Sequence, residues 1–352
     1  MSHTKSNKKG YGSFFSYIDP TSKHLATSIN NFQPENNKLF YTGRHAIKYV
    51  IETIKLDLNI NTFWLPEYYC QHVAHWLKSN YSNIKTYKVD PSGPNFTINA
   101  NDFAHPNDVI LVNNFWGISK CNITCDTNNV TIIEDHSHGW LSSACLNSKA
   151  DFCVASLRKS VPAPLGGMVW KPNGTSLKVL DLDDSNIFTD IWNTTDLAMR
   201  KKALFESQHH DDHELKTEFL TLVGEAETKM HHNYDLVELS ETNKKTLENY
   251  LKVDYLQLKA KNYQALKHVL KTNENFKTIE GSETPFGLTL HFTDEAIMSR
   301  FKTYLIKNNI YPSLLWPNNP EIYGFYLNIH IDYRYDENDM AYMSEIINLF
   351  SY

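Results

Sequence analysis

The sequence predicts an α/β protein, with a large domain built on a mostly parallel central sheet and a smaller C-terminal α+β domain. The main observation is a series of short apolar runs rich in β-branched residues, at Asp108–Asn113, Val130–Glu134 and Asp151–Ala155. Such nearly continuous runs are typical of parallel strands covered on both faces. The length of 352 residues suits two domains, and 41% hydrophobic with 21% charged residues indicates a folded chain.

The elements can be placed in order along the chain. The predicted boundaries are an N-terminal arm at 1–20, a large domain at 21–255 and a small domain at 256–352. Apolar periodicity predicts the helices, β-branched runs predict the strands, and Pro or Gly ends them. The expected elements are a helix at 43–56, a strand at 61–65, a helix at 69–77, the three strands named above, helices within 197–234 and 241–270, a strand at 287–292, a helix at 294–308, a turn at Tyr311-Pro312, a strand at 326–331 and a helix from Asp336.

Composition excludes several classes of function. The net charge of -6 and the scattered Lys and Arg residues argue against a nucleic-acid partner. No apolar run approaches the roughly 20 residues that span a bilayer, and the first ten residues are polar, so we expect no membrane partner and a cytoplasmic protein. The five cysteines are an odd number and predict free thiols; Cys121 and Cys125 do not complete a metal site.

Two segments are candidates for binding an anion and a cationic ring. Gly43 and Arg44 begin the first helix, where free backbone amides and the helix dipole favour a phosphate; alternatively, Thr42 there is only an N-cap. Asp135 follows a buried strand, where a carboxylate can meet a ring nitrogen. His138 could donate to an oxygen on the same ring. The alternatives for the Asp-His cluster are a helix cap or a metal site.

Two further segments could complete such a site. Lys159 lies in a loop bounded by Pro and Gly, and desolvation or the neighbouring Arg158 would make its amine more nucleophilic, although most loop lysines are simply solvated. Ser156 could bind a phosphate. Tyr69, or its neighbour Tyr68, could stack on a flat ring, although aromatic clusters more often belong to the core.

The order of these segments resembles the DegT/StrS-like sugar aminotransferases, which have fold type I of the pyridoxal 5'-phosphate (PLP)-dependent transferases. The resemblance extends from about Gly10 to the C-terminus. It also includes Asn113–Gly117, Asn262-Tyr263, Tyr311-Pro312, Ile331–Tyr335 and Asp339-Met340.

The resemblance implies a role for each candidate. Lys159 would bind PLP covalently and Asp135 would contact the pyridine nitrogen, with His138 near the ring oxygen. Ser156 and the amides of Gly43 and Arg44 would hold the phosphate.

This chain departs from the family in two places. The step from Ser156 to its lysine is three positions rather than five, and His136-Ser137 replaces an alanine pair. The family's stacking position falls on Cys70, so the ring could lie against Tyr69 instead.

The implied activity is transfer of an amino group from glutamate or glutamine to a keto sugar, commonly nucleotide-linked, for surface polysaccharide or related biosynthesis. The implied assembly is a homodimer with the site at the subunit interface, and Arg334 or Arg44 could meet a substrate anion. The alternatives are a PLP-dependent lyase, dehydratase or epimerase, a relative that has lost PLP and acts as a binding protein, and a metal hydrolase built on Asp135, His136 and His138.

Overall fold

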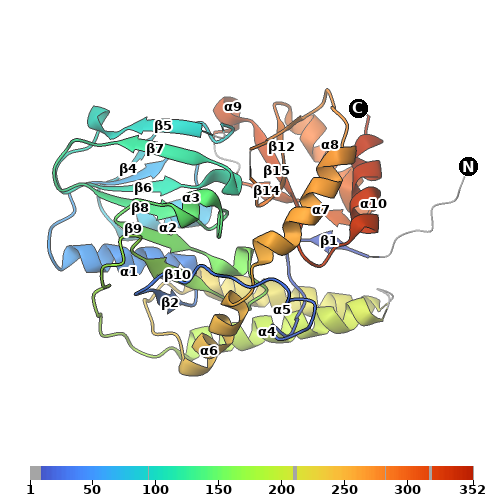
Figure 1. Cartoon of the computed structure of the whole chain (residues 1–352), viewed down its shortest axis with the longest axis horizontal. Helices are drawn as coiled ribbons and strands as arrows, with labels where there is room; N and C mark the ends of the chain where they lie inside the picture. The colour runs from blue at the N-terminus through green and yellow to red at the C-terminus, as the bar shows by residue number, and fades with distance from the viewer. Residues whose placement is uncertain (1–8, 94, 209–211, 282, 317–318, 352) are drawn as a thin grey trace, which may run out of the picture.

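The computed structural model describes residues 9–93, 95–208, 212–281, 283–316 and 319–351. Figure 1 shows two units, a larger one with the main sheet at the left and a smaller one, drawn in orange and red, at the upper right. Part of the predicted arm, residues 1–8, lies outside the described residues.

The large unit is organised around a seven-stranded sheet among the described residues, in the order β2-β10-β9-β8-β6-β3-β4. Strands β9, β8, β6, β3 and β4 are parallel, whereas β10 is antiparallel to both of its neighbours. This confirms the predicted mostly parallel sheet. The strands are β2 (Lys38–Phe40), β3 (Phe63–Pro66), β4 (Ile84–Tyr87), β6 (Val109–Asn113), β8 (Thr131–Asp135), β9 (Phe152–Ala155) and β10 (Gly167–Trp170).

Helix α1 (Gly43–Lys55) packs on one face of this sheet, as its apolar periodicity predicts. Its buried face includes Ala46, Val50 and Ile54, which share a core with sheet residues. Thr42 caps the helix, because its side-chain oxygen accepts a hydrogen bond from the backbone amide of His45 at 3.2 Å. The cap and the buried face together fix the helix start at the edge of the sheet.

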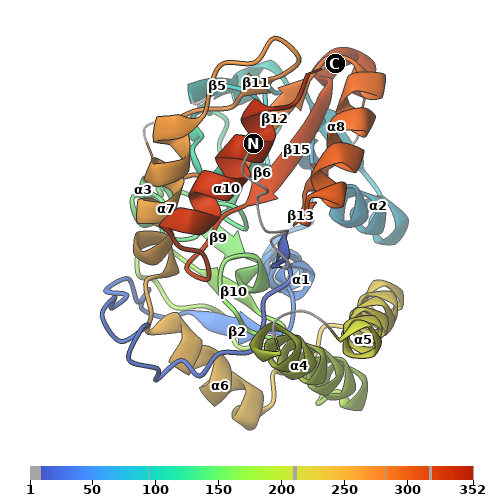
Figure 2. The same cartoon turned by 90° about the vertical axis from the view of Figure 1, so that its right-hand side faces the viewer.

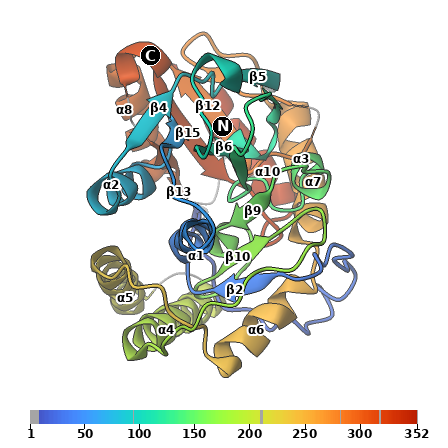
Figure 3. The ribbon, with the colours of Figure 1, turned by 90° about the vertical axis from the view of Figure 1, so that its left-hand side faces the viewer.

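Helices α4 (Asn186–Ser207) and α5 (His213–His232) pack side by side and lie next to α1 in all three views (Figures 1–3). The sequence predicted helical structure here only from Leu197 onward, whereas the first helix begins at Asn186 behind the N-cap Ser185. The end of α5 reaches α1, where Arg44 Nη2 donates to the carbonyl of Met230 at 2.8 Å.

The smaller unit has a four-stranded antiparallel sheet in the described chain, in the order β11-β12-β15-β14. The predicted turn at Tyr311-Pro312 is wrong. Tyr311 ends an extended segment that pairs with Gly12 in a parallel ladder, and Pro312 lies between that segment and the next strand. Helix α6 (Glu241–Leu251) packs on the large unit, because Leu247 and Tyr250 lie in its core, and α7 (Tyr255–Val269) leads into the smaller unit. The other elements of the smaller unit are β11 (Lys277–Thr278), β12 (Gly287–Phe292), α8 (Glu295–Lys307), β13 (Ile310–Tyr311), β14 (Ser313–Leu315), α9 (Pro320–Tyr323), β15 (Phe325–His330) and α10 (Glu337–Asn348).

The N-terminal arm is built into the smaller unit. Strand β1 (Tyr11–Gly12) pairs with β13, and Tyr11 is buried in the core of the smaller unit together with Tyr263 of α7. The remaining described elements are α2 (Gln71–Asn80), β5 (Asn95–Asn99), η1 (Ala100–Asp102), η2 (Phe115–Gly117), β7 (Lys120–Thr124), α3 (Ser143–Leu146) and η3 (Leu157–Lys159). Within the described ranges, no helix is long and apolar enough to cross a membrane.

Candidate active site

A cavity opens where the parallel strands end, and we call it the central cavity. Strands β6 and β8 end in register at Asn113 and Asp135, and Val154 of β9 is paired with Asp135. Ligands of α/β proteins commonly bind at this edge of a sheet. The polar and aromatic lining consists of Thr42, Gly43, Arg44, Cys70, His72, Asn113, Asp135, Ser137, His138, Ser156, Arg158, Lys159, His231 and Trp316.

The structure therefore brings six of the seven predicted site residues together. They are Gly43, Arg44, Asp135, His138, Ser156 and Lys159. The seventh, Tyr69, is buried beneath the cavity and does not line it. Its expected stacking role is wrong, because its ring is enclosed by the core and its hydroxyl is directed at Asp135.

Asp135 forms the acidic end of the central cavity. Its Oδ2 accepts a hydrogen bond from the Tyr69 hydroxyl at 2.5 Å, and its Oδ1 accepts one from the Ser137 backbone amide at 2.8 Å. Burial and the adjacent Asp135 raise the pKa of Tyr69 well above its usual value, so the phenol stays a donor. The buried carboxylate is thus held in place and can accept a further bond from a cationic donor in the cavity.

The part of the cavity wall formed by the start of α1, Ser156 and Arg158 is basic, and its backbone and side chains pack closely. A Cβ at Gly43 would lie 2.9 Å from the Cβ of Ser156, so glycine lets the helix start approach that side chain. Arg158 adds a second guanidinium to that of Arg44, and it pairs with Glu227 at 2.6 Å. Burial and the nearby Arg158 lower the pKa of Arg44 from its usual value. Helix-start amides, a hydroxyl and guanidinium groups suit an anion here.

Lys159 lines the same cavity. Its Nζ is 3.3 Å from Nε2 of His138 and 5.9 Å from the ring centre of Trp316. His138 is stacked between Trp316 and Phe286, with centroid distances of 4.9 and 4.4 Å. Burial, Lys159 and Lys259 lower the pKa of His138 well below its usual value. A neutral His138 can therefore accept a hydrogen bond from the lysine amine without charge repulsion.

Sequence reasoning did not find the aromatic wall of the cavity. Trp316 follows β14, far along the chain from the other site residues, in a segment with no motif. Its φ of 40° lies in the left-handed region, which a tryptophan rarely adopts. Because this backbone conformation is strained for a tryptophan, the surrounding structure must hold Trp316 in its place. Asn113 was noted only as part of a strand-end segment, and His231 of α5 gave no signal.

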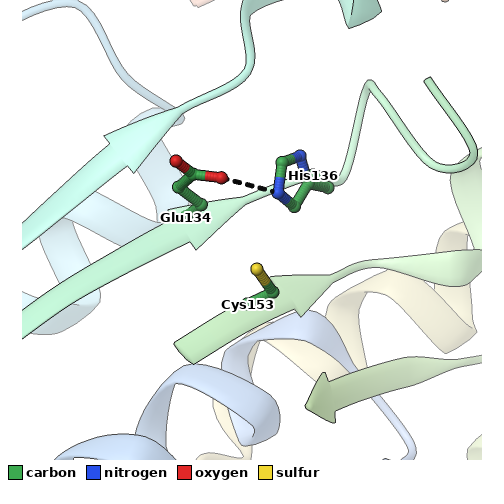
Figure 4. Close-up of side chains that lie close together, drawn as sticks. All are labelled: Glu134, His136 and Cys153. Carbon is green, nitrogen blue, oxygen red and sulfur yellow. Dashed lines mark ion pairs between the residues drawn. The ribbon is translucent and has the colours of Figure 1, made fainter. Parts of the chain in front are cut away.

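The metal-site alternative does not converge on the predicted residues. Within the described ranges, the group that could hold a metal is Glu134, His136 and Cys153, and it includes neither Asp135 nor His138 (Figure 4). Nε2 of His136 lies 3.1 Å from Glu134, although not in line for a good hydrogen bond, and Nδ1 lies 3.2 Å from the Asn114 amide.

The third member of that group also has a partner. The Cys153 thiol donates to Ser148 Oγ at 3.1 Å, and burial raises its pKa well above the usual value. Burial opposes ionisation of Glu134, but the adjacent His136 outweighs it and lowers the pKa of Glu134. These contacts form a polar network, so a ligand is not needed to explain the cluster.

Arg334, one of the two arginines expected to meet a substrate, does not line the central cavity. Its Nη2 bonds to Asp332 at 2.6 Å and to the carbonyl of Gly12 at 2.8 Å, and its Nη1 bonds to the carbonyl of Phe14 at 2.8 Å. The guanidinium therefore joins the arm to the smaller unit. Arg44 does line the cavity, at its basic end.

Comparison with known proteins establishes the fold. No family model and no curated protein matches the sequence. Among solved structures, the PLP form of Spr1654 from Streptococcus pneumoniae has a TM-score of 0.57 at 11% identity, covering 97% of this chain and 98% of that one. The sugar aminotransferase CalS13 from Micromonospora echinospora has a TM-score of 0.55 at 12% identity, covering 96% and 99%. DesI, solved in the presence of its TDP-sugar product, has a TM-score of 0.55 at 11% identity, covering 97% and 92%.

The chain thus has the fold of the PLP-dependent transferases of fold type I, over nearly its whole length. The expected fold class is confirmed. At identities of 11 and 12%, the structural similarity establishes the fold alone. The activity therefore has to be argued from the residues of the site.

Proposed function

We propose that this protein is a PLP-dependent aminotransferase. The observation that carries the proposal is that Lys159 lines one cavity together with a buried carboxylate and a basic anion cradle. These residues fit PLP, whose ring carries a nitrogen, a phosphate and an aldehyde that a lysine amine can bind. The amide Nδ2 of Asn113 also lies buried in the cavity wall, with no hydrogen-bond partner in the part of the chain that the structure describes. When bound, PLP supplies a ring that withdraws electrons from an attached amino compound.

Each residue around the cavity would have its own role. Asp135, held by Tyr69 and Ser137, would keep the ring nitrogen protonated. The amides of Gly43 and Arg44 would bind the phosphate together with Ser156.

Lys159 would hold the cofactor covalently and then carry a proton between substrate and cofactor carbons. Neutral His138, at 3.3 Å from the lysine Nζ, would orient that amine and face the ring oxygen. Trp316 would cover the ring in the place expected of Tyr69.

The proposed acceptor is a nucleotide-linked keto sugar, the kind expected from the sequence, and the proposed donor is glutamate or glutamine. Support comes from the fold neighbours CalS13, named a sugar aminotransferase, and DesI, solved with a TDP-sugar product. We further propose a cytoplasmic homodimer.

The test is a two-step assay on the protein purified with PLP. Adding glutamate or glutamine should convert the bound cofactor to its amine form, and adding a keto sugar nucleotide should convert it back. Lys159→Ala should abolish both conversions, whereas Lys149→Ala, an exposed lysine in the loop before β9, should leave them unchanged. Loss of a carboxyl group or of water from the substrate, without amino transfer, would instead indicate a lyase or dehydratase on this fold.

A further inference from the structure

A second cavity adjoins the central cavity, and we call it the side cavity. Lys159 and His138 line both cavities, so the two meet at the lysine. Other parts of the side-cavity wall come from the arm, from α7, from the end of β15 with the segment after it, and from the loops that carry Trp140 and Phe286. They include Tyr255, Lys259 and His330. The side cavity is therefore placed where a molecule reacting at Lys159 would extend.

Lys259 brings a cation to this cavity. The residue is only half-buried by exposed area, but its ammonium lies among protein atoms, where Nζ donates to the carbonyl of Phe286 at 3.0 Å. Burial lowers the pKa of Lys259 to about 8, with Asp332 opposing the shift. The amine is thus mostly charged at neutral pH, and an ammonium has three hydrogens to donate.

Several buried polar atoms around the side cavity have no hydrogen-bond partner among the described residues. They are the Tyr255 hydroxyl, Trp140 Nε1, His330 Nδ1 and His138 Nδ1, all on residues that line the cavity. Buried polar groups are nearly always paired, so such a cluster points to a missing ligand. Because the hydroxyl and the indole can donate, the ligand expected here is rich in acceptors.

The charges around the side cavity and its free volume restrict further which ligand can bind there. Asp332 also lines the cavity, but its charge is paired with that of Arg334 at 2.6 Å, and the neutral His330 lies beside it with Nε2 at 2.7 Å. Among the described residues, no carboxylate forms a salt bridge with Lys259. The free volume is about 20 Å³, and since one water needs roughly 10–15 Å³ of such space, one or two oxygen atoms fit. A carboxylate matches both conditions, whereas a sugar nucleotide is too large.

We propose that Lys259, with Tyr255, forms a carboxylate-binding subsite that holds the amino-acid donor beside Lys159. The inference rests on the proposed function for the identity of the donor. Binding of the carboxylate would satisfy the ammonium and the phenol together, and it would leave the donor's amino group directed at Lys159. The central cavity stays available for the ring and its phosphate.

The first test measures binding without amino transfer, by calorimetry of the cofactor-free protein with glutarate, a dicarboxylate that carries no amine. Lys259→Gln should weaken binding at least about tenfold, the scale of a lost charge-assisted hydrogen bond. Lys259→Arg should retain most of it. Lys261→Gln is the matched control, because Lys261 lies on the same helix with its side chain 75% exposed and paired with Glu337.

The pH dependence separates binding from a structural role. Glutarate affinity of the wild type should fall as the pH rises through about 8, because Lys259 then loses its charge. Lys259→Arg should remove that fall. The other titratable groups around the amine are Asp332, His330, His138, Lys159 and Tyr255. Asp332 stays charged over this range because Arg334 lowers its pKa despite burial, and the lowered pKa values of His330 and His138 keep both neutral.

The second test uses the protein with PLP. Lys259→Gln should raise the KM for the amino donor and leave the KM for the keto acceptor unchanged. If glutarate binds equally to wild type and Lys259→Gln, or binds to neither, the subsite is overturned while amino transfer can still stand. If glutarate binding depends on Lys259 but no amino transfer occurs, the subsite stands and the aminotransferase proposal fails.

Discussion

Asp135 illustrates how single residues set the chemistry of the site. Both carboxylate oxygens are already held, one by Tyr69 and one by the amide of Ser137. These bonds orient the group without supplying a positive charge, so it can still stabilise a cation in the cavity. Tyr69 therefore acts through Asp135 and is a positioning residue.

Asp135→Asn should leave cofactor binding largely intact but lower the rate of amino transfer by roughly 10²–10³-fold, the effect of removing one charge-stabilising group. The neutral amide cannot keep the ring nitrogen protonated. Cofactor content can be measured by absorbance and the rate by stopped flow. A variant that transfers amino groups at the wild-type rate would exclude Asp135 as the partner of the ring nitrogen.

The positions of Lys159, Asp135, Gly43 and Ser156 could be predicted from the sequence because each follows a buried strand or starts a helix. Parallel strands bring such positions to one edge of the sheet. Trp316 could not be predicted, because a loop in the smaller unit carries it to the cavity and no local pattern records that contact.

The helix α1 start and strand β10 form the tightest junction among the elements around the site. A Cβ at Gly167 would lie 2.1 Å from the carbonyl oxygen of Thr42 and 2.9 Å from the amide nitrogen of Gly43. The strand backbone thus presses against the residues that begin α1. A shift of β10 would therefore move Thr42 and Gly43, at the start of the helix that is proposed to bind the phosphate.

Gly167→Ala should lower the free energy of unfolding by about 1–3 kcal/mol, as expected for overpacking, and should weaken PLP binding. Urea denaturation and a cofactor titration would measure the two effects. Gly224→Ala is the control, because nothing lies within 4 Å of a Cβ there and Gly224 is inside helix α5. Replacing a helical glycine should stabilise by about 0.5–1 kcal/mol. Equal stabilities of the two variants would contradict this tight junction.

Helices and buried strands could be predicted where periodicity is strong, as in α1 and in β6, whose residues are all buried. Strand β10 was missed because it is only four residues long and follows a glycine pair that is typical of a loop. Strands β5 and β7 were missed because their exposed residues dilute the apolar signal. Their pairing with each other is a tertiary contact that short windows do not record.

On the scale of the whole molecule, the N-terminal arm is hydrogen-bonded to the C-terminal part of the chain. Arg334, which is paired with the buried Asp332, donates to the carbonyls of Gly12 and Phe14, and β1 extends the same contact by pairing with β13. Since His330 and Asp332 also line the side cavity, the arm supports the proposed donor subsite from outside.

Arg334→Met should destabilise the protein by about 3–5 kcal/mol, because it leaves Asp332 buried without its main partner. Thermal unfolding would show this as a lower Tm. Adding Asp332→Leu should recover much of the loss, since an apolar pair replaces the ion pair. An unchanged Tm in Arg334→Met would mean that the pair does not hold the arm.

The division into a larger and a smaller unit was predicted from the helical stretch Lys259–Leu270, expected to lead into a second domain, and from the α+β pattern that begins at Phe276. The interlocking of arm and smaller unit could not be predicted, because it depends on residues more than three hundred positions apart. The domain boundaries at residues 20 and 255 stay a prediction.

The central claim is that Lys159 is the lysine that bonds to PLP. The most direct test is to incubate the protein with PLP, reduce it with borohydride and locate the labelled lysine by peptide mass spectrometry. The account predicts a single stoichiometric label on Lys159, which is lost in Lys159→Ala. A label on Lys259, the lysine of the side cavity, or no label at all, would contradict it.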